Sequence, residues 1–355
     1  MTTPHESALA DPEFAALRDL SAKLGSDPAL VQGPGGNTSL KRNGVMWIKA
    51  SGTWLSQARE RPIMVAVDLA PLRAAIDRGD PACESGVEFV VAGQDSTGLR
   101  PSIETTMHAA LPQPVVLHVH CVETIAWAVR ADAEVQLAHR LRGLNWCFVP
   151  YVRPGLPLTQ LINRRRQVET VVVVLANHGL VVAGQTVAAA AAMLTEVSTR
   201  LRRPTHSAPD PDIAGLAMLA GGSIYRLPRM TSAHGVATDP QSLAIAQRGS
   251  LYPDHVVFLG PGVFVLRQNE TVDDSLRRAN QEGRGEPPLI LAPGKGVLIR
   301  ATAPPAVEAM VGCLSDVLSR LSDDEPIRVL SPEDEAALLN WDAERYRKTL
   351  ARRPG

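Results

Sequence analysis

Two histidines with metal-ligand spacing, His118 and His120, lie in the valine-rich segment PVVLHVH. This segment is expected to form a β-strand, in which side chains two residues apart project from the same face of the sheet. Both imidazoles can therefore reach one ion. A pair with this spacing also occurs as two structural histidines of a strand, so the pair alone leaves both interpretations open.

A third histidine, His178, ends the run TVVVVLANHG. A strand there carries the ring to the edge of the sheet, and Gly179 has no side chain to crowd the turn that follows. Three neutral imidazoles suit Zn2+, with Mn2+ and Co2+ as alternatives. Three nitrogen ligands also leave a fourth coordination position open for substrate oxygens, which is typical of a catalytic metal site.

An acidic residue, Glu104, follows Pro101 and Ser102 where a helix is predicted to begin, in RPSIETTMHAAL. One interpretation is a capping acid, because carboxylates in a first helical turn lie near unsatisfied backbone N–H groups. The other is an acid/base group beside the metal. His108 lies four residues later on the same helix face and is expected behind the site or in the core.

The elements that must position these residues alternate between helical and strand patterns. Apolar residues at helical spacing predict a helix over 11–25, and Asn43-Gly44 predicts the turn of a β-hairpin. Three valine-rich segments predict strands, and two segments between them predict helices. The strands are expected at 87–92, 114–120 and 170–179, and the helices at 103–111 and 188–203. These patterns indicate an α/β domain with a buried sheet.

The pattern restarts after the Pro-, Asp- and Ser-rich segment 205–215, which predicts a surface turn or a boundary. The later part of the chain reads as strands at 255–260, 263–267 and 287–301 and helices at 272–281, 307–322 and 333–353. We therefore expect a metal-binding catalytic domain over 8–215 and a small C-terminal α/β extension with a terminal helix over 240–355.

Composition limits the expected partners. The 355 residues are 45% hydrophobic and 21% charged with a net charge of −1, so we expect no nucleic-acid partner. No apolar run approaches the ~18 residues that span a bilayer, so we expect no membrane partner. The four cysteines are widely spaced and form no CxxC pair, which favours a reducing, cytoplasmic location.

Five short motifs follow one another along the chain: GGNTSL, SGT, PSIE, HVH and NHG. Together they resemble the class II aldolase/adducin family over roughly residues 12–205. PDHVVFLG and LILAPGKGVLI further resemble the aldolase half of rhamnulose-phosphate aldolase/dehydrogenase fusion proteins. The resemblance implies a three-layer α/β/α domain with a central, mainly antiparallel sheet, plus a smaller C-terminal α/β unit.

The resemblance also implies roles for individual residues. Glu104 would be the acid/base group, and Tyr151 would reach the active site from a neighbouring subunit of a homotetramer to donate a proton. The implied metal ligands are His118, His120 and His178, and the implied substrate- or phosphate-binding residues are Asn37, Ser51, Gly52 and Ser102. The family's sugar-phosphate aldolases usually carry a second serine where this chain has Ile103, which removes one hydroxyl donor from the predicted phosphate site.

The implied function is that of a zinc-dependent class II aldolase, an aldehyde-lyase of carbohydrate metabolism. It would cleave or form a C–C bond in a small hydroxy-ketone, hydroxy-acid or sugar (phosphate) through a metal-stabilised enediolate. A 4-epimerase or an oxo-acid sugar decarboxylase on the same site is an alternative. A non-catalytic, adducin-like scaffold is another, and metal retention distinguishes it, because a scaffold is expected to purify without stoichiometric zinc.

Overall fold

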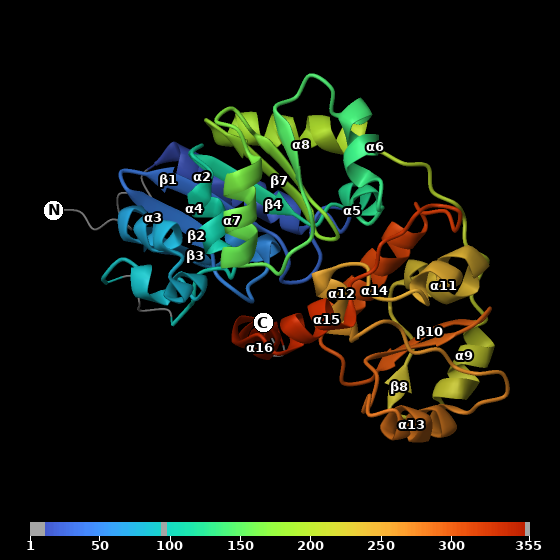
Figure 1. Ribbon diagram of the computed structural model, residues 1–355. Helices are drawn as coiled ribbons and strands as arrows, with labels where there is room; N and C mark the ends of the chain where they lie inside the picture. The colour runs from blue at the N-terminus through green and yellow to red at the C-terminus, as the bar shows by residue number, and fades with distance from the viewer. Residues whose placement is uncertain (1–10, 94–97, 352–355) are drawn as a thin grey trace. The chain divides into compact units, whose positions relative to one another are not determined.

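The computed structural model describes residues 11–93 and 98–351, which divide into two compact units (Figure 1). The first unit contains the described residues up to Ala128, Ala133–Arg202, and those from Asn340 onward. The second contains Val129–Asp132 and Arg203–Leu339. Residues 203–215, expected in the first domain, thus group with the second unit, and the end of the chain groups with the first.

A seven-stranded sheet forms the centre of the first unit. Its strands are β1 (Asn37–Arg42), β2 (Val45–Lys49), β3 (Met64–Asp68), β4 (Val115–Val119), β5 (Trp146–Val149), β6 (Val172–Leu175) and β7 (Gly179–Gly184). Their order is β3-β2-β1-β4-β7-β6-β5, and each neighbouring pair is antiparallel except β5 with β6. The predicted mainly antiparallel sheet is confirmed.

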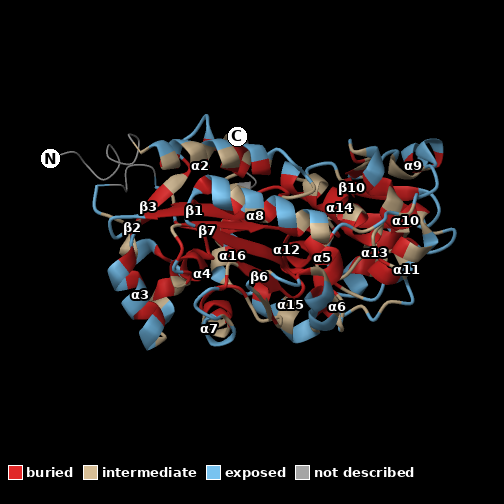
Figure 2. Ribbon diagram, turned by 90° about the horizontal axis from the view of Figure 1, so that it is seen from above, coloured by how far each residue is buried: buried red, intermediate tan, exposed pale blue. Residues whose placement is uncertain are grey.

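Helices cover both faces of this sheet. The helices are α2 (Pro12–Gly25), α5 (Val122–Ala128), α6 (Ala133–Arg140) and α8 (Val187–Arg200) on one face, and α3 (Leu69–Arg78), α4 (Thr105–Ala110) and α7 (Leu156–Arg165) on the other. Figure 2 shows the buried strands between helices whose outer faces are exposed. Along β4, Val115 and Leu117 pack with α2 and α8, whereas Val116 packs with α4 and α7. His118 shares the face of Val116 because side chains alternate along a strand.

The predicted hairpin forms, with Asn43 and Gly44 at φ 50° and 82° between β1 and β2. Both residue types tolerate this left-handed backbone, which suits a two-residue turn. The predicted first helix also forms, and the side chain of Asp11 caps its N-terminus by accepting the N–H of Glu13.

Three of the strands expected from apolar runs are absent from their places in the described chain. Residues 87–92 form a short 3-10 helix (Val87–Phe89), and only an isolated bridge joins Val90 to Val67 of the edge strand β3. Residues 255–259 lie in the helix α12 (Pro253–Leu259), whose residues are all buried, and Gly260 follows its end. A fully buried helix carries the same unbroken apolar run as a buried strand, and Pro253 begins it. Residues 263–267 contribute only a bridge between Val265 and Leu291.

The second unit contains a three-stranded antiparallel sheet in the order β8-β10-β9. Its strands are β8 (Tyr225–Arg226), β9 (Leu289–Ala292) and β10 (Gly296–Arg300), and its other helices are α9 (Ile213–Ala220), α10 (Gly235–Thr238), α11 (Pro240–Ala246), α13 (Val272–Gln281), α14 (Pro305–Leu318) and α15 (Pro332–Leu339). The predicted smaller C-terminal α/β unit is confirmed. The single helix predicted over 333–353 is wrong, because α15 ends before Asn340 and a separate helix, α16 (Asp342–Ala351), follows. In the described part of the chain, no helix has the length and apolar character needed to cross a membrane.

Lys41 of β1 predicts a pH dependence of stability. Its buried Nζ donates hydrogen bonds to the carbonyl oxygens of Leu111 and Gln113. Burial, and then the charge of Arg73, lower the pKa of Lys41 from 10.5 to about 7. The unfolded chain keeps the higher pKa and binds more protons between these values, so the Lys41 contribution to the free energy of unfolding rises with pH across this window. Each unit of pKa difference corresponds to ~1.4 kcal/mol.

Lys41→Met removes this titration and should flatten the stability profile between pH 7 and 10.5 relative to the wild type. Urea unfolding at a series of pH values measures it. Equal slopes for the two proteins would show that Lys41 keeps its ordinary pKa in the folded state.

Candidate metal centre

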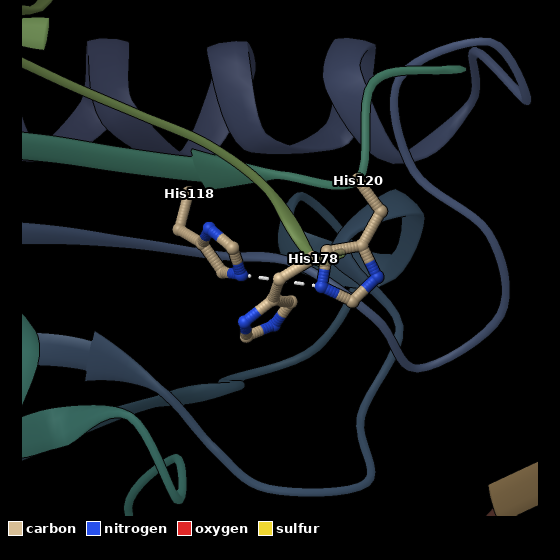
Figure 3. A group of neighbouring side chains, drawn as sticks. All are labelled: His118, His120 and His178. Carbon is tan, nitrogen blue, oxygen red and sulfur yellow. Dashed lines mark hydrogen bonds between the residues drawn. The ribbon is translucent and has the colours of Figure 1, made fainter. Parts of the chain in front are cut away.

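Three histidines converge at one end of the seven-stranded sheet (Figure 3). His118 lies on β4, His120 directly follows that strand, and His178 lies in the turn between β6 and β7. The antiparallel pairing of β4 with β7 places His118 opposite Val181 and so brings this turn beside the end of β4. The ligand nitrogens lie within 4.8 Å of one another, and Nε2 of His118 is 3.1 Å from Nε2 of His120.

The protonation of His118 suits a metal ligand. Its Nδ1 lies 3.1 Å from the carbonyl oxygen of Leu180, which can only accept a hydrogen bond. Nδ1 therefore carries the proton, and the lone pair of Nε2 faces the other two rings. His118 is fully buried, and His120 and His178 are each 6% exposed. Three converging buried imidazoles are a donor set that fits a divalent ion.

Glu104 completes the cluster from the other side. Its Oε1 lies 3.3 Å from Nε2 of both His118 and His178 and has no hydrogen-bond partner among the described residues. A cation between the carboxylate and the imidazoles would satisfy this buried oxygen. Burial raises the pKa of Glu104, but the electrostatic interaction with His118, His178 and His120 and a hydrogen bond from Asn37 outweigh it and lower the pKa to about 2.

The alternative role of Glu104 as a capping acid finds no support in the hydrogen bonds of helix α4. Glu104 is the residue that precedes the helix, and its side chain makes no capping hydrogen bond. Ser102 caps instead, since its carbonyl oxygen accepts the N–H of Thr105 and its Oγ accepts the N–H of Glu104. The Glu104 carboxylate is thus directed at the histidines.

A buried chain of hydrogen bonds holds the second carboxylate oxygen. Asn37 donates through Nδ2 to Oε2 of Glu104 at 2.8 Å and to Oγ of Ser102 at 3.0 Å. Its Oδ1 accepts from Nε2 of His108, whose Nδ1 lies 2.7 Å from Oγ of Ser39. Burial, as the largest cause, holds the pKa of His108 well below its usual value, so the ring is neutral. Asn37, predicted to bind substrate, here orients Glu104.

We expect Asn37→Ala to weaken zinc binding about tenfold, because Asn37 orients the Glu104 carboxylate that faces the imidazoles and would stabilise a cation between them. Without the amide, Oε2 of Glu104 loses a buried donor and the carboxylate is free to rotate. Competition against a chromophoric chelator measures the affinity, with Asn280→Ala on the exposed side of α13 as the matched control. An affinity equal to that of the control would contradict an orienting role.

Lys49, the last residue of β2, has a structural role. Its side chain is 2% exposed, and Nζ donates to the carbonyl oxygens of Pro34 and Thr53, each at 2.8 Å. These bonds join the glycine-rich loop before β1 to the SGT turn after β2. Lys49 therefore fixes the two loops that carry predicted substrate-binding residues.

The remaining predicted anion-binding residues lie on adjacent loops. The N–H of Ser51 donates to the carbonyl oxygen of Arg100 at 2.9 Å, and the N–H of Ser102 donates to that of Lys49 at 3.1 Å. The buried Oγ of Ser51 has no hydrogen-bond partner within the described ranges. Gly52 follows at φ 76°, a left-handed conformation that favours glycine. Their binding of a substrate anion stays a prediction.

Tyr151 lies after β5, the edge strand. Val149 pairs with Leu175 in the parallel ladder of β5 and β6, and His178 follows β6 three residues later. Tyr151 is therefore at the same end of the sheet as the histidines and is half-buried. Its predicted role across a subunit contact stays a prediction.

Comparison with known proteins places the first unit in a family. Residues 15–203 match the family described as Class II Aldolase and Adducin N-terminal domain. "Uncharacterized oxidoreductase YuxG" of Bacillus subtilis (strain 168) is 34% identical over 175 residues, covering 46% of this chain and 25% of that protein. The chain thus spans about a quarter of the length of this relative.

Two solved structures are similar over about half of this chain. The N-terminal class II aldolase domain of a conserved protein from Thermoplasma acidophilum is 25% identical with a TM-score of 0.45, covering 52% of this chain and 90% of that chain. The l-fuculose-1-phosphate aldolase from Thermus thermophilus is 17% identical with a TM-score of 0.34, with the same two coverages of 52% and 90%.

Proposed function

Since the chain belongs to the class II aldolase and adducin family, we propose that it is a divalent-metal lyase that cleaves or forms a C–C bond in a small hydroxylated substrate. The observation that carries this proposal is the approach of Oε1 of Glu104 to within 3.3 Å of Nε2 of both His118 and His178. A carboxylate that faces a trio of buried imidazoles is suited to proton transfer beside a cation.

The three imidazoles would hold the ion, and Zn2+ suits this donor set best, with Mn2+ and Co2+ compatible. The ion, when bound, supplies a Lewis acid that polarises oxygen atoms of the substrate next to the bond that breaks. The protein supplies a site from which water is largely excluded, because the histidines and Glu104 are all at most 6% exposed.

Glu104 moves the proton in this proposal. Its Oε2 is held by Asn37 at 2.8 Å, which leaves Oε1 to accept the proton of a substrate hydroxyl as the C–C bond breaks. Return of the proton to the carbon of the released fragment completes the cycle. Tyr151, at the same end of the sheet, would donate a hydrogen bond to the oxygen of the leaving aldehyde within a homotetramer.

The proposed substrate is a small carbohydrate or hydroxy-acid that carries an anionic group. The hydroxyl of Ser51, which has no hydrogen-bond partner among the described residues, and the guanidinium of the exposed Arg100 are donors that suit a carboxylate or a phosphate. Related sugar-phosphate aldolases usually have a serine where this chain has Ile103, so this loop offers one hydroxyl donor fewer. A carboxylate needs fewer hydrogen-bond donors than a phosphate and therefore suits this loop better.

A substrate panel tests the function. The zinc-loaded full chain is incubated with ketose phosphates, hydroxy-acids and oxo-acid sugars, and released aldehyde is trapped and quantified. We expect aldehyde release that chelation abolishes and added zinc restores. Epimerisation or loss of CO2 in place of aldehyde release would assign a different reaction to the same site. A metal-loaded protein inactive on every member of the panel would favour the adducin-like scaffold.

A further inference from the structure

The end of the chain packs against the loops that carry the predicted substrate-binding residues. Helix α16 belongs to the first unit, although residues 203–339 separate it in sequence from the rest of that unit. Its Leu350 lies directly over Gly52, where an added Cβ would come within 2.7 Å of the leucine Cβ. The SGT turn is thus covered by a helix that the family match over 15–203 does not include.

Two cation–π contacts join α16, and Trp341 just before it, to two arginines of the first unit. The guanidinium of Arg100 lies 4.2 Å from the ring centre of Tyr346, and that of Arg153 lies 4.4 Å from the ring centre of Trp341. Arg153 also pairs with Glu84 at 2.8 Å. Aromatic rings at this distance attract a guanidinium and restrict its orientation. Arg100 is therefore held at the edge of the SGT turn.

The helix has distinct inner and outer faces. Glu344 and Arg347 are 2% and 7% exposed, with Nη1 of Arg347 3.2 Å from Oε1 of Glu344. Arg345 and Thr349 are exposed. This pair lies within the helix, so the inner face of α16 is buried without leaving either charge unpaired.

A cavity of about 370 Å3 lies between α16 and the loops. Its walls include Ser51, Arg100, Ile103, Trp341 and Tyr346. This volume matches the size of small-molecule sites. Ser51 is 4% exposed and its Oγ has no hydrogen-bond partner among the residues that the structure describes, so the cavity contains a donor ready for a ligand. Ile103 of the cavity wall directly precedes Glu104 in the chain and so connects this wall to the acid/base group.

The charges around this cavity favour an anion at one end. Glu84, also in the lining, is neutralised by Arg153 and accepts the N–H of Leu156 at 2.9 Å. Asp342 pairs with Arg345 at 3.3 Å. Arg100 and Ser51 are then the groups that a carboxylate or phosphate would meet.

We propose that α16 forms the outer wall of the substrate cavity, and that Trp341 and Tyr346 determine which small hydroxylated anions reach Glu104. The identification of the ligand as substrate rests on the proposed function, whereas the presence of an anion-binding cavity under α16 does not. The aromatic rings limit the size of the ligand, and Arg100, held by Tyr346, binds its charged end.

Binding of inorganic phosphate and of glycolate to the zinc-loaded full chain tests this proposal by calorimetry. We expect Tyr346→Ala and Leu350→Ala each to weaken binding of at least one probe about tenfold, because each loosens the wall that holds Arg100. Thr349→Ala, on the exposed face of the same helix, is the matched control and should bind like the wild type. Hydrogen exchange at the amides of Ser51 and Ser102 should accelerate in the first two variants only.

Unchanged binding and unchanged exchange in both Tyr346→Ala and Leu350→Ala would overturn the proposal, as would equal effects in Thr349→Ala. Failure of the proposed function has a different signature. If the substrate panel yields no reaction while probe binding and exchange respond as expected, the cavity wall stands and the lyase assignment fails. Melting temperatures of all three variants identify any general loss of folding.

Discussion

Alanine in place of His118 will weaken zinc binding by more than about a hundredfold and remove metal-dependent activity. A residue that binds the metal directly contributes more to the affinity than the groups that orient it. His118 contacts both a second imidazole and Glu104, with its Nε2 3.1 Å from that of His120 and 3.3 Å from Oε1 of Glu104.

Elemental analysis after gel filtration measures this effect, with zinc expected near one equivalent in the wild type and well below it in the variant. His139→Ala on the exposed face of α6 is the control for loss of a histidine as such. Equal zinc in His118→Ala and His139→Ala would place the metal elsewhere.

The second large effect is expected for Glu104→Gln, which should lower turnover by about 10^2–10^4 while zinc remains bound. Glutamine has nearly the same shape, and its carbonyl oxygen can still accept the hydrogen bond that Asn37 donates at 2.8 Å. It cannot accept the substrate proton. The loss should therefore fall on turnover and leave the histidine trio in place.

Single-turnover rates and zinc content, measured on the same sample, separate these two quantities. Glu88→Gln, an exposed carboxylate of the preceding segment, is the control. If Glu104→Gln turns over at the wild-type rate, the carboxylate does not transfer the proton. If it loses its zinc, Glu104 is needed for metal binding and its role must be measured by a different substitution.

The histidine trio could be predicted from the sequence because its geometry follows from local rules. Two residues two apart on a strand share a face, and a histidine after a second valine-rich strand lies at the edge of the same sheet. The orienting role of Asn37 could not be predicted in this way. It depends on the pairing of β1 with β4, which places Asn37 opposite His118, and this pairing joins residues distant in the chain.

The C-terminal part was predicted less well for related reasons. The apolar run at 255–260 fits a buried strand and a buried helix equally, and the tertiary environment of α12 decided between them. The charged tail was predicted to be helical, but its break near Asn340 and its position over Gly52 depend on contacts with the rest of the first unit. Sequence periodicity contains no information about such a distant partner.

X-ray absorption spectroscopy of the zinc-loaded wild type tests the central claim most directly. We predict one zinc per chain with three imidazole nitrogens at about 2.0–2.1 Å and the remaining scattering from oxygen. His118→Ala, loaded at the same protein concentration, should lose this signature. A wild-type spectrum with sulfur neighbours, or with oxygen neighbours only, would contradict a metal centre built from His118, His120 and His178.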